Sequence, residues 1–485
     1  MNKPIRRVSI FCLLLVLALM LRVNWVQGVQ GSAWAANSHN ERVKYDRYAY
    51  PRGNIIAGGQ AVTKSDFVNG LRYKYKRSWV DGAMYAPVTG YSSQAYDSSQ
   101  LEKLEDGVLS GTDSRLFFRN TLDMLTGKPK QGGDVVTTID PKTQKAAYDA
   151  LGNRKGAAVA IDPRTGAILA LVSTPSYDPS TFAGGSAADT KAWTDLNNDP
   201  NKPLLNRALR ETYPPGSTFK LITAATAFET GKYKNPTDAT DTPNPYILPG
   251  TSTELKNASS DEPCEKATVQ DAMDLSCNTV FGKMGADLGR DALRAQAEKF
   301  GFNNDHLDVP IRPSASYYPK GSSPDGTALD AIGQHDTRAT PLQMAMVAAA
   351  ICNNGSLMEP YLVAQERSAR DVISTHSEHQ LSQAVSPATA QKLQQLMESV
   401  VQNGTGKNAK IPNATVGGKT GTAQHGQDNT GLPFAWFVSY AKGADGKQVA
   451  VAVVVEDGAA DRNEISGGSL AAPIAKSVMQ AALGR

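Results

Sequence analysis

The stretch 156-GAAVAIDPRTGAILALVSTPSYDP-179 contains two short apolar runs separated by a turn-forming sequence. We expect strands at 157–161 and 167–172, joined by the turn Asp162-Pro163-Arg164-Thr165-Gly166. Gly166 fits the position in such a loop that requires a positive φ angle. The stretch therefore predicts a β-hairpin within a larger sheet.

Further strand signals occur only near the two ends of the chain, with helical patterns between them. "GDVVTTIDPKTQKAAYDAL" predicts a strand at 135–139 and a helix through residue 151. Strands are also expected from "VGGKTGTA", "FAWFVSYA" and "QVAVAVVVE", at 416–423, 434–441 and 448–456. Helices are expected at 340–351, 387–401 and 470–483. This order predicts an α+β domain whose antiparallel sheet unites early and late strands and is flanked by helices.

The N-terminal sequence predicts a membrane anchor. Lys3, Arg6 and Arg7 precede an apolar run that, extended to residue 26, is about long enough to cross a bilayer. A cleaved signal peptide is the alternative, but its cleavage site at 33–35 would lie unusually far from the apolar run. The basic flank predicts a cytoplasmic N-terminus, and Arg22 would reach toward the outer membrane surface.

Three regions follow from these patterns. Residues 1–26 form the cytoplasmic tip and the transmembrane anchor, and the polar, turn-rich residues 27–134 form a small β-rich pedestal. Residues 135–485 form the α+β domain, which we expect outside the cytoplasm.

Composition excludes some function classes. The chain has 485 residues, with 50 basic and 47 acidic side chains, so its net charge of +3 gives no sign of nucleic-acid binding. No CxxC sequence or histidine cluster predicts a metal site, and we expect no cofactor. Cys264 and Cys277 lie 13 positions apart in an exported region, where a disulfide is permitted but not required.

The segment 211-ETYPPGSTFK-220 places a serine and a lysine three residues apart. Two prolines and a glycine precede an alanine-rich helical pattern, so Ser217 is expected at a helix start with Lys220 one turn later on the same face. The chain has one other Ser-x-x-Lys match, Ser439 to Lys442, but it falls on an expected strand, where these side chains point to opposite faces. Ser217 is the better candidate nucleophile, although a serine here can also be a simple helix cap.

Two more motifs follow in order. Ser276-Cys277-Asn278 lies between helical stretches, whereas the other Ser-x-Asn match, at 38–40, is beside the anchor. Lys419-Thr420-Gly421 lies on an expected strand and is followed by Thr422. Each motif alone has an ordinary interpretation, such as a turn or a solvated lysine. All three in this order, each in a suitable structural setting, rarely occur together by chance.

The three motifs resemble the active-site triplet of penicillin-binding proteins and serine β-lactamases. The resemblance to class B penicillin-binding proteins covers nearly the whole chain. It includes "PRGNI", "TTIDPKTQKAAYDAL", "NRALRETYPPGSTFK", "IGQ" at 332–334 and "KTGTAQHG". It implies the transpeptidase fold of that family and a D,D-transpeptidase that cross-links peptidoglycan stem peptides outside the membrane and is acylated by β-lactams.

The resemblance also implies roles in acyl transfer. Ser217 would be the nucleophile and Lys220 its base, with Ser276 relaying a proton to the leaving amine. An ordinary lysine has a pKa near 10.4, so its neutral form costs about 4.6 kcal/mol at pH 7. Burial and the nearby cation of Lys419 would lower that cost.

Substrate contacts are implied for the remaining motif residues. Asn278 would hold the donor peptide, while Lys419, Thr420 and Thr422 would bind the terminal carboxylate of D-Ala-D-Ala or of penicillin. The oxyanion hole would use the backbone N–H groups of Ser217 and Thr422, and such donors contribute about 3 to 4 kcal/mol each. Gly421 would leave room for substrate beside the strand.

Other functions remain open from the sequence. A D,D-carboxypeptidase shares the same acylation machinery and differs in using water as the acceptor. A β-lactam sensor would be acylated without turnover, but only about seven residues precede the anchor. A serine β-lactamase is less consistent, because the Glu-x-x-Leu-Asn segment of class A enzymes is absent from the chain. Stem peptides, β-lactams and unidentified cell-wall synthesis proteins are the expected partners.

Overall fold

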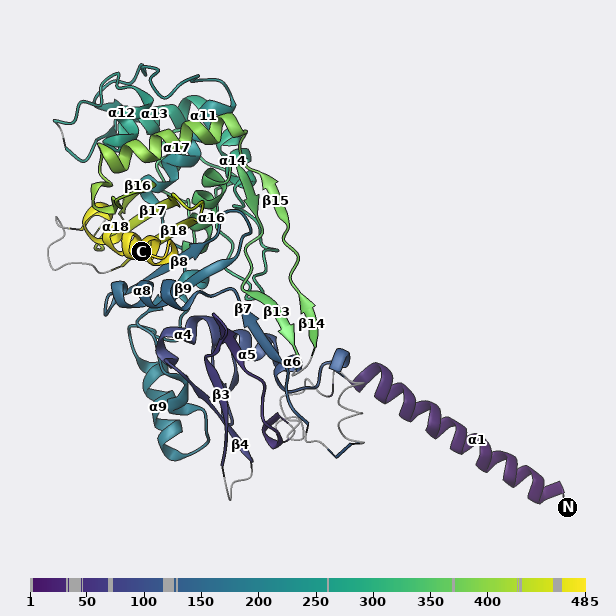
Figure 1. Cartoon of the computed structure of the whole chain (residues 1–485). Coiled ribbons are helices and arrows are strands. Elements are labelled where there is room, and N and C mark those ends of the chain that lie inside the picture. Colours follow the sequence, from purple (N-terminus) through teal and green to yellow (C-terminus); the bar gives the residue numbers. More distant parts are fainter. Residues whose placement is uncertain are drawn as a thin grey trace.

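The computed structural model (Figure 1) describes residues 3–31, 34, 45, 47–68, 73–116, 126–127, 130–259, 261–368, 371–424, 426, 430–456 and 465–485. Helix α1 (Lys3–Trp25) extends away from the folded body and continues into the π-helical turn η1 (Val26–Gln30). The helix is exposed throughout and is long and apolar enough to span a membrane. Most of the alternative cleavage site at 33–35 falls outside the described residues.

The central sheet has the strand order β16-β17-β18-β8-β9, and every neighbouring pair in it is antiparallel. Its strands are β8 (Gly156–Ile161), β9 (Ile168–Thr174), β16 (Ala414–Ala423), β17 (Phe434–Gly443) and β18 (Gln448–Val455). The prediction that early and late strands share one antiparallel sheet is confirmed. Gly166 has the expected positive φ, +86°, and a Cβ there would lie 2.1 Å from Glu359 O.

Helices cover both faces of this sheet, which explains why its strands are almost wholly apolar. Helices α8 (Pro141–Leu151) and α18 (Ala472–Ala482) pack on one face, and α16 (Pro341–Cys352) packs on the other. Successive side chains of β18 alternate between the two layers, as the pleat requires. Helix α17 (Pro387–Gln402) packs against the edge strand β16.

The expected strand at 135–139 belongs to a different sheet. It is β7 (Asp134–Thr137), which lies between β1 (Ile55–Ala57) and β13 (Val363–Arg367). The strand order is β14-β13-β7-β1-β2, with β2 (Gln60–Ala61) at one edge. Figure 1 shows β13 and β14 (Val372–Thr375) returning from the upper body to lie beside β7. The pedestal sheet therefore combines strands from residues 55–61 and 134–137 with strands from residues 363–375.

The rest of the pedestal region contains short helices as well as hairpins. The hairpins pair β3 (Thr63–Phe67) with β4 (Tyr75–Trp79), and β5 (Ser92–Ser93) with β6 (Asp97–Ser98). The helices are α4 (Gly82–Thr89), α5 (Gln100–Leu104) and α6 (Asp106–Leu109). The β-rich description therefore understates its helical content.

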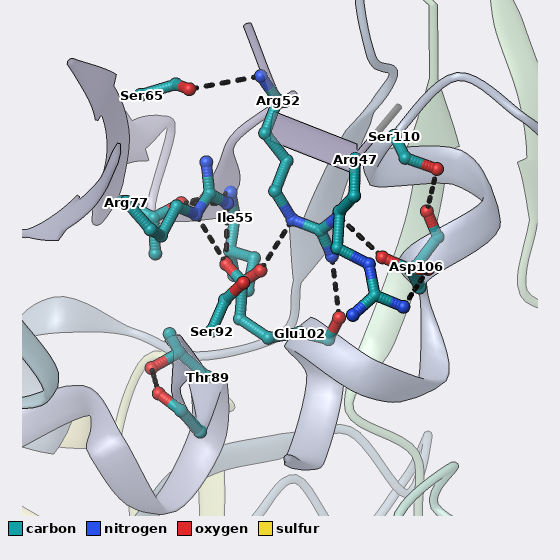
Figure 2. A network of polar contacts seen from close by, with 12 residues as sticks. Arg47, Arg52, Ile55, Ser65, Arg77, Thr89, Ser92, Glu102, Asp106 and Ser110 are labelled. Carbon is teal, nitrogen blue, oxygen red and sulfur yellow. Dashed lines mark hydrogen bonds and ion pairs between the residues drawn. The ribbon is translucent and has the colours of Figure 1, made fainter. Parts of the chain in front are cut away.

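A buried network of charges joins these elements (Figure 2). The Glu102 carboxylate is fully buried and accepts from Arg52 Nε at 2.8 Å and from Arg77 Nε at 2.6 Å. Arg52 also contacts Asp106, and Arg77 donates to Thr63 Oγ1 at 2.8 Å. Burial lowers the pKa of Arg77 while the Glu102 charge opposes that shift. The carboxylate thus compensates two buried guanidinium groups.

Replacing Glu102 with glutamine should destabilise the pedestal strongly. The change leaves two buried cations without their shared anion, and breaking such a pair typically costs about 3 to 5 kcal/mol. Chemical unfolding of the full-length protein in detergent would measure the effect. Asp149→Asn is the matched control, because it removes one carboxylate from the exposed pair that Asp149 forms with Lys145 and should leave the unfolding midpoint unchanged. Equal midpoints for the two variants would contradict a stabilising role for this network.

Candidate active site

The Pro214-Pro215-Gly216 turn fixes the backbone around Ser217. Gly216 has a φ of +53°, which favours glycine, and its N–H donates to Gly333 O at 2.9 Å. Ser217 lies on the 3₁₀ turn η4 (Gly216–Phe219), and the α-helix α11 (Lys220–Glu229) begins only at Lys220. Neither element has a side-chain cap, so the helix-cap interpretation of Ser217 is wrong.

Lys220 is fully buried at the first position of α11. Its Nζ donates to Ser276 O at 2.6 Å, to Asn278 Oδ1 at 2.8 Å and to Ser276 Oγ at 3.3 Å. The described hydrogen bonds of this amine therefore connect the first motif directly to the second. Burial lowers the pKa of Lys220 well below its usual value, and the charge of Lys419 lowers it further.

The second motif lies on the connection between α12 (Val269–Asp274) and α13 (Asn278–Leu288). Ser276 has a φ of +61°, a conformation unusual for a non-glycine residue and often found at functional sites. Cys277 next to it forms a disulfide with Cys264, which resolves the question that the sequence left open. The disulfide ties this connection to the segment before α12, close to the contacts that Ser276 makes with Lys220.

Asn278 uses both ends of its amide group within the protein. Its Oδ1 accepts from Lys220, and its Nδ2 donates to Lys256 O at 3.0 Å. One N–H of the amide nitrogen is left for another partner, because the group has two.

Lys419 is fully buried on the edge strand β16, so its interpretation as a solvated lysine is wrong. Its Nζ donates to Thr420 O at 3.2 Å. Burial lowers the pKa of Lys419 to about 7, and the nearby Asp274 carboxylate opposes that shift. The charge of Lys419 in turn disfavours the protonated form of Lys220.

The absence of a side chain at Gly421 is explained by packing. A Cβ at Gly421 would lie 3.0 Å from Pro215 O, Thr218 Cγ2 and Trp436 Cβ, and the residue does not line the cavity described below. The expectation that a side chain there would crowd the substrate is therefore wrong. The missing side chain leaves room for the turn that holds Ser217 to approach β16.

The three motifs meet at one open cavity of about 1090 Å³. Five of the predicted residues line it: Ser217, Ser276, Asn278, Thr420 and Thr422. Lys220 and Lys419 lie buried behind this lining. The cavity therefore presents a serine hydroxyl, an amide and two threonines at its surface, with two perturbed amines directly beneath them.

Other lining residues were not predicted from sequence. The polar ones are Lys256, Asn257, Glu262, Gln334, His335, Thr405, Asn408, Gln424, Ser466 and Ser469. Thr405 Oγ1 lies 2.7 Å from Thr420 Oγ1, so it orients a predicted residue. Gly467 packs against the third motif, since a Cβ there would lie 2.7 Å from Gly421 O. The small-residue run at 466–469 was the only sequence signal for this contact.

Within the described part of the chain, no group of three or more histidine, cysteine or acidic side chains could hold a metal ion. His425, which follows the third motif, lies outside the described residues.

Two family descriptions match the chain. Residues 156–480 match the penicillin binding protein transpeptidase domain, and residues 52–135 match the penicillin binding protein A dimerisation domain. The peptidoglycan D,D-transpeptidase PbpA of Mycolicibacterium smegmatis is 42% identical, over 100% of this chain and 99% of that protein.

Solved structures are also similar. The penicillin G acyl-enzyme complex of penicillin-binding protein A from M. tuberculosis has a TM-score of 0.82 and 41% identity, covering 90% of this chain and 100% of that chain. The D,D-transpeptidase domain of a peptidoglycan glycosyltransferase from Eggerthella lenta has a TM-score of 0.76 and 34% identity, covering 90% and 99%.

Proposed function

Because the chain belongs to the class B penicillin-binding protein transpeptidases, we propose that it is a peptidoglycan D,D-transpeptidase with Ser217 as its nucleophile. The convergence of the three motifs on one cavity is the observation that supports this role for Ser217 most directly. The covalent penicillin complex of its M. tuberculosis relative supports an acyl-enzyme mechanism.

The first half-reaction forms the acyl-enzyme. Lys220, whose lowered pKa favours the neutral amine, accepts the proton of Ser217 Oγ as the oxygen attacks the carbonyl carbon of the penultimate D-Ala. The C–N bond to the terminal D-Ala then breaks. Ser276, already hydrogen-bonded to Lys220, passes the proton to the departing amine. Backbone N–H groups of Ser217 and Thr422 stabilise the negative oxygen of the intermediate.

The third motif binds the terminal carboxylate of the substrate. Thr420 and Thr422 donate hydrogen bonds from the cavity lining, and the protonated fraction of Lys419 supplies positive charge beneath them. Asn278 offers its remaining N–H to the donor peptide. A β-lactam binds in the same way, because its carboxylate and acyl carbon take the positions of the carboxylate and the reacting carbonyl carbon of the donor peptide.

The second half-reaction transfers the acyl group. The amino group of another stem peptide attacks the ester carbon, a new amide bond forms, and the C–O bond to Ser217 breaks. Lys220, neutral again after the first half-reaction, takes the proton that the attacking amine loses and passes it to Ser217 Oγ, which restores the free enzyme. The polymer gains one cross-link for each D-Ala released.

The location follows from the N-terminal helix. We place α1 across the cytoplasmic membrane with Lys3, Arg6 and Arg7 inside, because basic residues favour the cytoplasmic side. The folded body then lies outside, where its peptidoglycan substrate is found. Proteins of cell-wall synthesis at the same membrane are its expected partners.

Product analysis tests the proposed function. The full-length protein in detergent micelles should convert lipid-linked and polymerised peptidoglycan into cross-linked dimers, and penicillin should block their formation. Trimmed monomers without dimers would instead indicate a D,D-carboxypeptidase. Covalent penicillin binding without either product would indicate a sensor.

A further inference from the structure

His335 lies on the turn that follows α15 (Pro324–Asp330) and lines the same cavity as Ser217. This turn contacts the nucleophile turn directly, since Gly333 O accepts from Gly216 N, and a Cβ at Gly333 would lie 2.2 Å from Gly216 O. His335 therefore belongs to a segment packed against the backbone of Ser217. None of the roles proposed above uses this histidine.

The backbone of His335 is held in an unusual conformation. Its φ is +58°, and its carbonyl accepts from Arg338 Nη1 at 2.8 Å. Non-glycine residues with positive φ cost free energy and cluster at active sites and ligand-binding sites. The conformation places an imidazole in the cavity lining at a position where glycine would be less strained.

A buried carboxylate orients the imidazole. Asp330 is fully buried and lies 3.3 Å from His335 Nδ1. Asp330 is itself fixed by Ser322 Oγ at 2.6 Å, by Asp336 N at 3.1 Å and by Thr337 Oγ1 at 3.2 Å. A carboxylate at this distance favours the tautomer that donates from Nδ1, which leaves Nε2 as a hydrogen-bond acceptor.

The ring geometry leaves that acceptor nitrogen available. A Cβ at Gly326 would lie 3.2 Å from His335 Cε1 and 3.4 Å from Nδ1, so α15 occupies this edge of the ring. The side chain is 38% exposed, in agreement with its place in the cavity lining. With Nδ1 facing Asp330, Nε2 is the ring nitrogen left for an N–H donor in the cavity that this side chain lines.

The reaction needs two peptides in the cavity, and the residues proposed for the donor lie on β16 and on the segment that begins α13. The α15 turn forms a separate side of the cavity, where the carboxylates of Asp330 and Asp336 lie 3.3 and 3.8 Å from His335 Nδ1 and Arg338 contacts the His335 carbonyl. The carboxylates beside the His335 ring favour a cationic group there, whereas the protonated fraction of Lys419 beneath the donor residues favours a carboxylate. The cavity volume of about 1090 Å³ exceeds the usual range for a single small ligand.

We infer that His335 binds the amino group of the acceptor stem peptide and orients it toward the acyl-enzyme carbonyl. Nε2 accepts a hydrogen bond from that amino group, and Asp330 acts through His335 as a positioning residue. This inference rests on the proposed transpeptidase function and specifies where its second substrate binds.

The inference can be tested by measuring how the acyl-enzyme divides between transfer to an amine and hydrolysis by water. Full-length protein in detergent is given a stem-pentapeptide donor and increasing concentrations of an amine acceptor, and the ratio of amide product to hydrolysed product is measured. His335→Asn should lower this ratio by about tenfold, the effect expected for one lost hydrogen bond in the attacking complex. Asparagine tolerates positive φ, so the turn should keep its conformation. His335→Ala should lower the ratio similarly.

Acylation by penicillin separates the outcomes, because it needs no acceptor. Both variants should be acylated at nearly the wild-type rate, which also reports that they fold. An unchanged product ratio would overturn the role of His335 while leaving the transpeptidase function intact. A parallel fall in acylation would also overturn it, since the residue would then serve both half-reactions. Failure of the proposed function itself would appear as absence of amide product from the wild-type protein.

Discussion

Ser217→Ala should abolish covalent labelling of the protein by fluorescent penicillin. The hydroxyl is the only atom of the proposed mechanism that forms a bond to the substrate, so the other groups at the cavity cannot substitute for it. Loss of a nucleophile from such a unit costs roughly 10⁴-fold or more in rate. Labelling of the variant should fall to background at every penicillin concentration, measured on denaturing gels and by intact mass.

Ser439→Ala is the matched control for this substitution. Ser439 begins the other Ser-x-x-Lys match, and the structure places it in the middle of β17, buried and hydrogen-bonded to Val451 O at 3.3 Å. It does not line the cavity, so this variant should be labelled like the wild type. Labelling that survives Ser217→Ala, or that disappears only in Ser439→Ala, would show that the nucleophile has been misassigned.

The central sheet could be predicted because its strands are continuous apolar runs. Strands buried on both faces lack polar alternation, and the strands β8, β9, β17 and β18 all show such runs. The pairing of the pedestal sheet could not be predicted in this way. β7 joins β13 across more than two hundred residues, and β13 has a half-buried, mixed sequence that gives little periodic signal.

The motif residues were found because their spacing has a local meaning. Residues three positions apart, such as Ser217 and Lys220, lie on the same face of a helix. On a strand, residues at that spacing, such as Ser439 and Lys442, point to opposite faces. Contacts between residues that are distant in the sequence could not be predicted from such spacing. The reason for Gly421 depends on the Pro215 carbonyl, and the place of His335 in the cavity depends on packing between two turns more than a hundred residues apart. Such contacts leave only an isolated glycine or histidine in the sequence.

Lys220→Ala should reduce the rate of acylation by penicillin by roughly 10² to 10⁴-fold, the range expected for loss of a general base. The variant retains Ser217, so slow labelling should remain detectable at long times. Lys220→Arg should be equally defective, because a guanidinium stays protonated and cannot accept the serine proton. Stopped-time labelling with fluorescent penicillin measures both rates.

The pH dependence of acylation in the wild type follows from the same residue. Burial and the charge of Lys419 both lower the pKa of Lys220, so its neutral form is more populated than that of an ordinary lysine. Acylation should fall as the pH drops through this lowered pKa and Lys220 becomes protonated. Lys419→Gln removes one of the two causes, so the pKa of Lys220 rises and the acidic limb of the profile should move to higher pH.

Lys442→Ala is the control for the lysine substitutions. Lys442 is the lysine of the second Ser-x-x-Lys sequence, on β17. Its Nζ donates to Gln394 Oε1 at 2.8 Å, and the residue does not line the cavity. Its variant should keep both the wild-type rate and the wild-type pH profile. An acidic limb that stays in place in Lys419→Gln would mean that the two buried amines do not interact. A wild-type acylation rate in Lys220→Ala would mean that another group deprotonates Ser217, and Ser276, which lies 3.3 Å from Lys220 Nζ, would then need its own base.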